Sequence, residues 1–172
     1  MEANSSPTYI KYGLDFRNLI WVIGTILATV VVILVGNEWV LRFVHVIASA
    51  LWTGADIFVG FVIGPILRRL EPETRRAVML RLTPKTIFIM PTLAIVSPTA
   101  GWFLAVQTGY LELSFPEMWW LIVALGITAA MAVQGLLFIL TSNFRVFREL
   151  SKDKPDGEKV AKITRGFFFN VA

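Results

Sequence analysis

Two ionisable side chains, His45 and Asp56, lie inside the apolar stretch 43–69, which is long enough to cross a bilayer. An aspartate at the centre of a membrane helix costs at least about 2.5 kcal/mol, so such groups persist mainly where they face protein, a cofactor or water. Histidine is a common ligand of metals and of haem iron, and an intramembrane aspartate serves as a hydrogen-bonding partner or proton carrier. His45 and Asp56 are therefore the first candidates for function.

The two residues share one stripe of a predicted helix. At 100° per residue, His45, Trp52 and Asp56 lie within about 40° of one another, with Ser49 between them. Asp56 lies about 16 Å along the axis from His45, close to mid-membrane, so one metal ion cannot bind both. The stripe fits either a ligand with a buried polar partner or part of a proton path. We expect Asp56 to be buried in protein, as a hydrogen bonder or paired with Gln134.

The composition indicates an integral membrane protein. Apolar residues make up 56% of the 172 residues and charged residues 16%, and the mean hydropathy is +0.68, values that exclude a soluble domain of this length. Cysteine is absent, which excludes disulfides, thiolate zinc sites and iron–sulfur clusters. A metal or haem has to rely on His45, a methionine, a carboxylate or backbone oxygens.

Four apolar segments meet the length of about 20 residues that a spanning helix needs. They cover about 18–36, 39–67, 86–110 and 118–143. We therefore expect an all-α helical bundle in a single membrane domain, 1–172, with a cytoplasmic tail at 144–172. The first segment has no small-residue cleavage site after it and is read as an uncleaved helix. The three phenylalanines in 165–172 are either an interfacial anchor or the start of a fifth helix.

Basic residues predict the orientation in the cell membrane. Of the sixteen Lys and Arg residues, fifteen fall on one side of the four-helix arrangement and only Arg42 on the other. Short cytoplasmic loops collect Lys and Arg, so the N-terminus should be cytoplasmic. The basic residues stand at helix ends without a nucleic-acid motif, which favours anionic lipid as their partner and excludes nucleic acid.

The third and fourth segments contain further candidates. Pro84, Pro91 and Pro98 recur every seven residues, which predicts either a simple kink or a helix bowed around a cofactor. Met118 lies at the same outer level as His45 and is a candidate second haem ligand. The tryptophans near the outer boundary are expected to form an interfacial belt rather than to contact a cofactor; they are Trp39, Trp102, Trp119 and Trp120.

Several of these residues resemble a known family pattern. The stretch His45-x6-Trp52-x-Gly54, with Phe58 and Gly64-Pro65-x-x-Arg68, is similar to the copper-resistance D (CopD) superfamily, which includes the HemJ-type protoporphyrinogen oxidases. The likeness continues through 89–92 and 101–102 and, more faintly, 143–145 and 165–170. It implies that His45 is a haem b ligand and that 165–172 opens a fifth helix. With His45, we expect Trp52 and Met118 to contribute to the cofactor site.

The chain also departs from the HemJ pattern. HemJ-type proteins carry a second histidine after the Pro-Arg element and a lysine early in the fourth helix, where this chain has apolar residues and Trp119-Trp120. These differences argue against protoporphyrinogen oxidation and leave open whether the chain is an enzyme. A copper site needs several His or Met ligands, and His45 is the single histidine in the sequence. This argues against a copper site.

Two functions from different classes remain. The first is a CopD/HemJ-like membrane protein that binds haem b through His45, for electron transfer or for structure. The second is a non-catalytic accessory subunit, or a homo-oligomer, whose Gly60-x-x-x-Gly64 face packs against other membrane subunits. A proton or metal-ion pathway built around Asp56 ranks below both.

Overall fold

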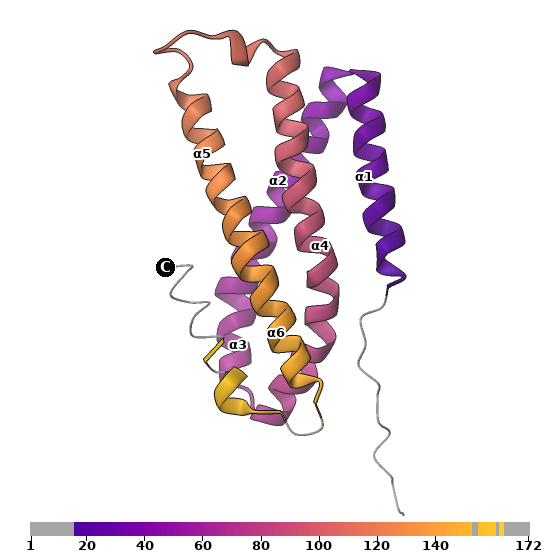
Figure 1. Cartoon of the computed structure of the whole chain (residues 1–172), viewed down its shortest axis with the longest axis vertical. Helices are drawn as coiled ribbons and strands as arrows, with labels where there is room; N and C mark the ends of the chain where they lie inside the picture. The colour runs from indigo at the N-terminus through magenta and orange to yellow at the C-terminus, as the bar shows by residue number, and fades with distance from the viewer. Residues whose placement is uncertain (1–15, 153–154, 161, 164–172) are drawn as a thin grey trace, which may run out of the picture.

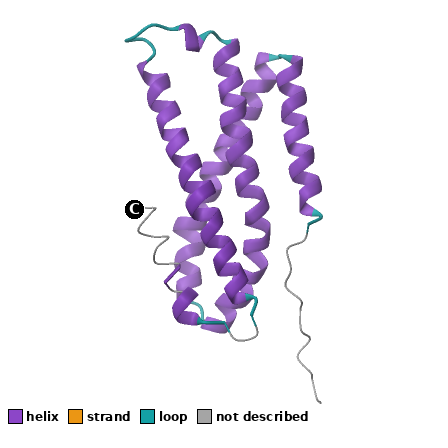
Figure 2. Cartoon of the chain, in the orientation of Figure 1, coloured by secondary structure: helices purple, strands orange, loops and turns teal. Residues whose placement is uncertain are grey.

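The computed structural model describes residues 16–152, 155–160 and 162–163. The predicted anchor or fifth-helix start at 165–172 lies outside this part of the chain, as does the polar segment 1–15. The described residues form long helices joined by short turns, without a strand (Figure 2).

Four helical rods are long and apolar enough to cross a membrane. The first is α1 (Asn18–Val35); the second joins α2 (Glu38–Phe58), the π-helical segment η1 (Val59–Ile63) and α3 (Gly64–Arg69); the third is α4 (Pro72–Gln107); the fourth joins α5 (Trp119–Val133), the π-helical segment η3 (Gln134–Ile139) and α6 (Leu140–Leu150). A short 3₁₀ turn, η2 (Tyr110–Glu112), lies between α4 and α5. The predicted all-α membrane bundle with four spanning helices is confirmed.

Two of the predicted helix boundaries are wrong. The third helix begins at Pro72 rather than near residue 86, and the fourth continues to Leu150, so the expected tail begins as helix. Pro72 suits a first helical turn because its φ is already fixed near the helical value, and the N–H that it lacks would have no partner there. The negative charge of Glu73 complements the positive end of the helix dipole. Hydropathy detects only the part of a helix that lies in hydrocarbon, and these charged turns extend beyond it.

The extended ends of α4 and α6 pack against each other. Leu80 of α4 forms a buried apolar cluster with Val146, Phe147 and Leu150 of α6. Arg76 donates hydrogen bonds to the backbone carbonyls of Leu150, at 3.0 Å, and Lys152, at 2.8 Å. The guanidinium group thereby satisfies carbonyls at the C-terminal end of α6, which have no partner within the helix.

Local sequence explains the tight turn between α1 and α2. Gly36 ends α1 with a left-handed backbone (φ 68°), and its N–H reaches the carbonyls of Val32 and Ile33. Asn37 then caps α2, because its side-chain oxygen accepts a hydrogen bond from the Val40 N–H at 3.1 Å. This turn brings α1 and α2 into an antiparallel hairpin (Figure 1).

Helix α4 is the centre of the bundle, with contacts to α1, α2 and α6. Half of the buried side chains in the described part of the chain belong to it, including Ile87, Ala94, Ser97 and Ala100. The helix remains continuous through its three prolines. By contrast, α5 leans away from α4 toward the end that carries η2, whereas α6 lies against α4 at the other end (Figure 1).

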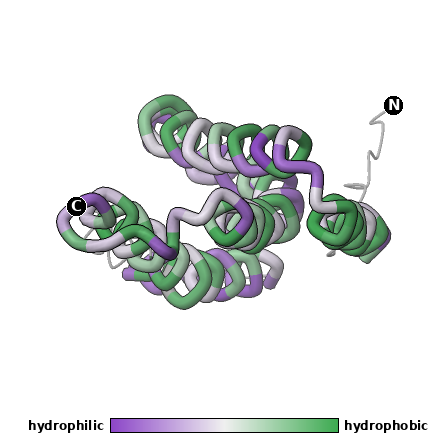
Figure 3. The backbone as a smooth tube through the Cα atoms, turned by 90° about the horizontal axis from the view of Figure 1, so that it is seen from above, coloured by the Kyte–Doolittle hydropathy of each residue, from purple (hydrophilic) through white to green (hydrophobic). Residues whose placement is uncertain are grey.

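Apolar residues run along the rods of the bundle (Figure 3), and many of their large side chains are exposed, as expected for a lipid-facing surface. Trp21, Leu34 and Phe61 are each almost four-fifths exposed. Charged residues instead collect where α3 ends, α4 begins and α6 ends, and we call this part the basic end of the bundle. Its arginines include Arg68, Arg69, Arg75, Arg76, Arg145 and Arg148. The protein is therefore membrane-embedded, with most of its charged groups at the ends of the helices.

Candidate functional site

His45 lies on the face of α2 that packs against α4. Its Nδ1 is 2.9 Å from the backbone carbonyl oxygen of Ser97. A carbonyl oxygen only accepts hydrogen bonds, so Nδ1 carries the proton and donates it. In the neutral ring Nε2 then holds the lone pair, which is the arrangement found when a backbone carbonyl orients a metal-binding histidine.

Two serines fix the backbone on both sides of this contact. The Ser49 hydroxyl donates to the His45 carbonyl oxygen at 2.7 Å, and its oxygen is 2.7 Å from the buried Ser97 hydroxyl. Ser49 has one proton and uses it on His45, so Ser97 donates to Ser49. The three residues thus join α2 to α4 through a continuous hydrogen-bond network.

The His45 ring lies directly against the backbone of Gly101. A Cβ atom added at Gly101 would stand 2.6 Å from Cε1 and 2.8 Å from Nδ1 of the ring. Carbon atoms in good contact are about 3.5–4.0 Å apart, so any side chain at this position would displace the imidazole. A glycine here is therefore required for the observed position of the histidine.

A cleft between α4 and α5 opens beside His45. Its volume is about 370 Å³, within the range of roughly 300–1,000 Å³ usual for ligand sites. Its lining is apolar apart from a few polar atoms and is completed by Pro98, Gly101, Trp102, Leu104, Ala105, Tyr110, Trp120, Leu121, Ala124, Leu125, Thr128, Ala129 and Ala132. Near one end, the rings of Tyr110 and Trp120 meet edge to face at 5.2 Å.

Small residues give α5 a flat wall on this side. Ala124, Thr128 and Ala132 recur every four residues, so they share one helix face, and all three line the cleft. The opposite wall contains Gly101 and Ala105 of α4. Two walls of small side chains suit a flat ligand that contacts both helices.

The other predicted ligand-site residues lie elsewhere. Trp52 is buried but lines a second pocket together with Asp56, and its ring approaches Gly135. Met118 precedes α5 as its N-cap and is not among the residues that line the His45 cleft. The predicted stripe on α2 therefore divides between two sites.

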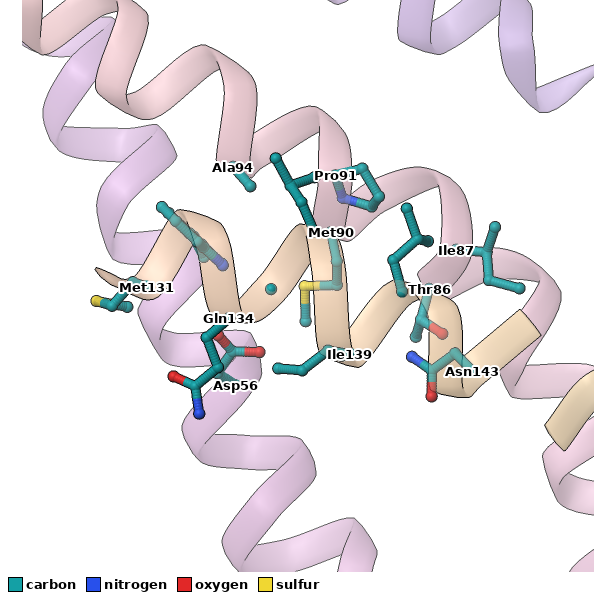
Figure 4. A pocket seen from close by; sticks show the side chains of 14 residues that line it. Asp56, Thr86, Ile87, Met90, Pro91, Ala94, Met131, Gln134, Ile139 and Asn143 are labelled. Atoms are coloured by element: carbon teal, nitrogen blue, oxygen red, sulfur yellow. The ribbon is translucent and has the colours of Figure 1, made fainter. Parts of the chain in front are cut away.

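The second pocket, of about 60 Å³, lies between α2, α4 and η3 (Figure 4). Its polar lining residues are Asp56, Gln134, Thr86 and Asn143. A volume of this size holds a few water molecules, since one needs about 10–15 Å³. The pocket is therefore a small site with a few polar groups in a mainly apolar lining, rather than a cofactor cavity.

The expectation that Asp56 is buried is wrong for the isolated chain, because its side chain is exposed. Asp56 lines the second pocket together with residues of α4 and η3, and these contacts leave its side chain exposed.

Sequence reasoning did not single out several residues of the His45 cleft. Trp102 and Trp120, predicted to be belt residues, both line it. Ser97 and Gly101 contact His45 from a different helix, so no spacing along the chain connects them. For the wall of the cleft that α5 forms, the one available signal in the sequence was the four-residue repeat of Ala124, Thr128 and Ala132.

Comparisons with protein-family models, curated proteins and solved structures found no match to this chain. The resemblance to CopD and HemJ proteins accordingly remains a prediction from the sequence. Among the described residues, no group of three or more His, Cys, Asp or Glu side chains is placed to hold a metal ion.

Proposed function

We propose that the protein binds haem b in the cleft between α4 and α5, with the Nε2 atom of His45 as the iron ligand, and that it serves in electron transfer or uses the haem structurally. The observation that carries this proposal is the position of His45. Its Nδ1–H is held by the Ser97 carbonyl while the residue lines an apolar cleft of about 370 Å³.

The donor set fits haem better than a bare metal ion. A protein site for a bare transition metal needs several side-chain ligands, and His45 is the only imidazole in the chain. A porphyrin brings four equatorial nitrogens of its own and needs the protein for the axial positions. One oriented histidine beside a flat-walled cleft is what such a cofactor requires.

Each cleft residue has a defined task in this proposal. Ser97 orients the imidazole through its carbonyl, Gly101 leaves room for the ring, and the small side chains of α5 admit a flat macrocycle. Trp102 and Trp120 provide aromatic surface and help to exclude water. Met118 does not line the cleft, so the proposal rests on His45 as ligand. When bound, haem b would supply one-electron redox chemistry.

The test is haem content in matched variants. The wild-type protein, expressed with added haem and purified in detergent, should show a Soret band, and His45→Ala should lose it while still inserting. His45→Gly should regain the band when imidazole is added, because free imidazole can occupy the vacated position. Trp52→Phe changes the second pocket and should keep the band. Equal haem content in His45→Ala and wild type would refute the proposal.

A second candidate function is that of an accessory subunit in a larger membrane complex or in a homo-oligomer. The observation that favours it is the Gly60-x-x-x-Gly64 face: within the described chain, no atom from another rod lies within 4 Å of a Cβ added at either glycine. Small-residue faces of this kind allow close helix packing in membranes. A colourless protein that co-purifies with a stoichiometric membrane partner, and loses it in Gly60→Leu, would favour this function over haem binding.

We also propose that the basic end faces the cytoplasm in the cell membrane. The support is that α1 and α4 both run away from the basic end, where α4 begins and α6 ends (Figure 1). Cytoplasmic loops collect Lys and Arg, so this end and the N-terminus belong to the cytoplasmic side.

A further inference from the structure

A third hollow, separate from the two already described, lies between α1 and α4. Its volume is about 460 Å³. It is lined by Asn18, Trp21, Val22 and Thr25 of α1 and by Lys85, Phe88, Ile89, Thr92 and Leu93 of α4. We call it the α1–α4 groove.

The groove changes from polar to apolar along the helix axes. Helices α1 and α4 both run away from the basic end (Figure 1). The lining residues that come first along each helix therefore lie at a similar height along the bundle axis. The first level has Asn18 and the ammonium group of Lys85. The next has Trp21 and Phe88, and the amphipathic ring of a tryptophan favours the membrane interface.

The deepest level is effectively apolar although it contains two hydroxyls. Thr25 donates its hydroxyl proton to the Trp21 carbonyl at 2.8 Å, and Thr92 donates to the Phe88 carbonyl at 2.7 Å. Both hydroxyl protons are thus used within their own helices, and the remaining contact surface comes from methyl groups and from Leu93. An alkyl chain can lie here without leaving a polar group unsatisfied.

The charge at the polar end is positive. Lys85 is exposed and is the only charged residue of the lining, and no ion pair involves it in the part of the chain described. Arg81, also exposed, lies one turn earlier on the same face of α4. An ammonium group binds phosphate as a compact point charge, and basic sites between helices favour anionic headgroups.

We propose that the α1–α4 groove binds an anionic phospholipid, with the phosphate at Lys85 and an acyl chain between Phe88, Ile89 and α1. The lipid would join α1 to the rest of the bundle, because Thr29 is the single described α1 residue that is buried. The proposal does not depend on haem binding, and it selects a lipid over free phosphate because most of the lining is apolar.

The experiment measures lipid retained by the full chain. Protein in nanodiscs of phosphatidylcholine with a minor fraction of phosphatidylglycerol is extracted in mild detergent, and bound lipid is measured by native mass spectrometry. Lys85→Ala should lower retained phosphatidylglycerol roughly fivefold, which corresponds to ~1 kcal/mol per basic residue. Lys85→Arg should retain it. Ile89→Trp, which fills the groove and keeps the charge, should also release lipid.

The matched control is Arg75→Ala, which removes an exposed positive charge from the basic end but outside the groove. It should leave phosphatidylglycerol unchanged. Equal loss in Arg75→Ala and Lys85→Ala would overturn the proposal in favour of diffuse attraction. Displacement of the lipid by millimolar inorganic phosphate would overturn it in favour of a simple anion site, and retention in folded Ile89→Trp would show that no acyl chain occupies the groove.

Discussion

Replacing Gly101 with alanine should displace His45 and abolish haem binding without preventing membrane insertion. The added Cβ would stand 2.6 Å from Cε1 of the ring, whereas carbon atoms in contact are about 3.5–4.0 Å apart. The ring must therefore retreat by about 1 Å. Such a movement breaks the 2.9 Å hydrogen bond from Nδ1 to the Ser97 carbonyl and turns Nε2 away from its present direction.

The energetic cost follows from the same geometry. Forcing an extra methyl group into a packed helix contact costs typically about 1–3 kcal/mol. Gly126→Ala is the matched control, because nothing in the described structure lies within 4 Å of its added Cβ, and alanine is favoured over glycine in a helix by roughly 0.5–1 kcal/mol. We expect Gly101→Ala to lower the thermal unfolding midpoint and the Soret absorbance per chain, and Gly126→Ala to lower neither.

A double-mutant cycle isolates the contact between the two residues. In a His45→Ala background the ring is gone, so Gly101→Ala should no longer destabilise the protein, and the coupling free energy should be about 1–3 kcal/mol. The cycle is measured by thermal unfolding in detergent without haem. The reasoning is refuted if Gly101→Ala costs as much without the imidazole as with it.

Three further predictions concern separate parts of the structure. Ser97→Ala should cost about 0.5–1.5 kcal/mol of unfolding free energy but keep the haem, because the carbonyl that orients His45 remains; a folded, haem-free variant would contradict this. Arg76→Ala should lower stability by about 1–3 kcal/mol through loss of its two hydrogen bonds to the end of α6, whereas exposed Arg75→Ala should change it by less than about 0.5 kcal/mol; equal thermal shifts would contradict the role of Arg76. A cysteine at Asn37 should react with an impermeant maleimide in intact cells and one at Ser151 only after lysis; the reverse pattern would invert the orientation.

Much of the fold is predictable from sequence because the bilayer imposes both length and composition on a spanning helix. The turn at Gly36 and Asn37 carries recognisable helix stop and start signals. The start of α4 at Pro72 was missed because its first turns are charged and stabilised by contact with α6 rather than by lipid. Such a contact joins residues about seventy positions apart and has no periodic signal.

The candidate site was only partly predictable. His45 was found because an ionisable group within an apolar run is costly. The contacts of His45 with Ser97 and Gly101 were not predicted, because they depend on how α2 packs against α4. Helical spacing correctly placed His45 and Trp52 on one stripe, yet the stripe meets two different pockets along its length.

The most direct test of the central claim is the absorption spectrum of the wild-type protein, purified in detergent from haem-supplied cells and recorded before and after reduction. Haem ligated by His45 predicts a Soret band that shifts on reduction, with about one haem per chain. A folded, monodisperse protein without a Soret band under these conditions would contradict the account.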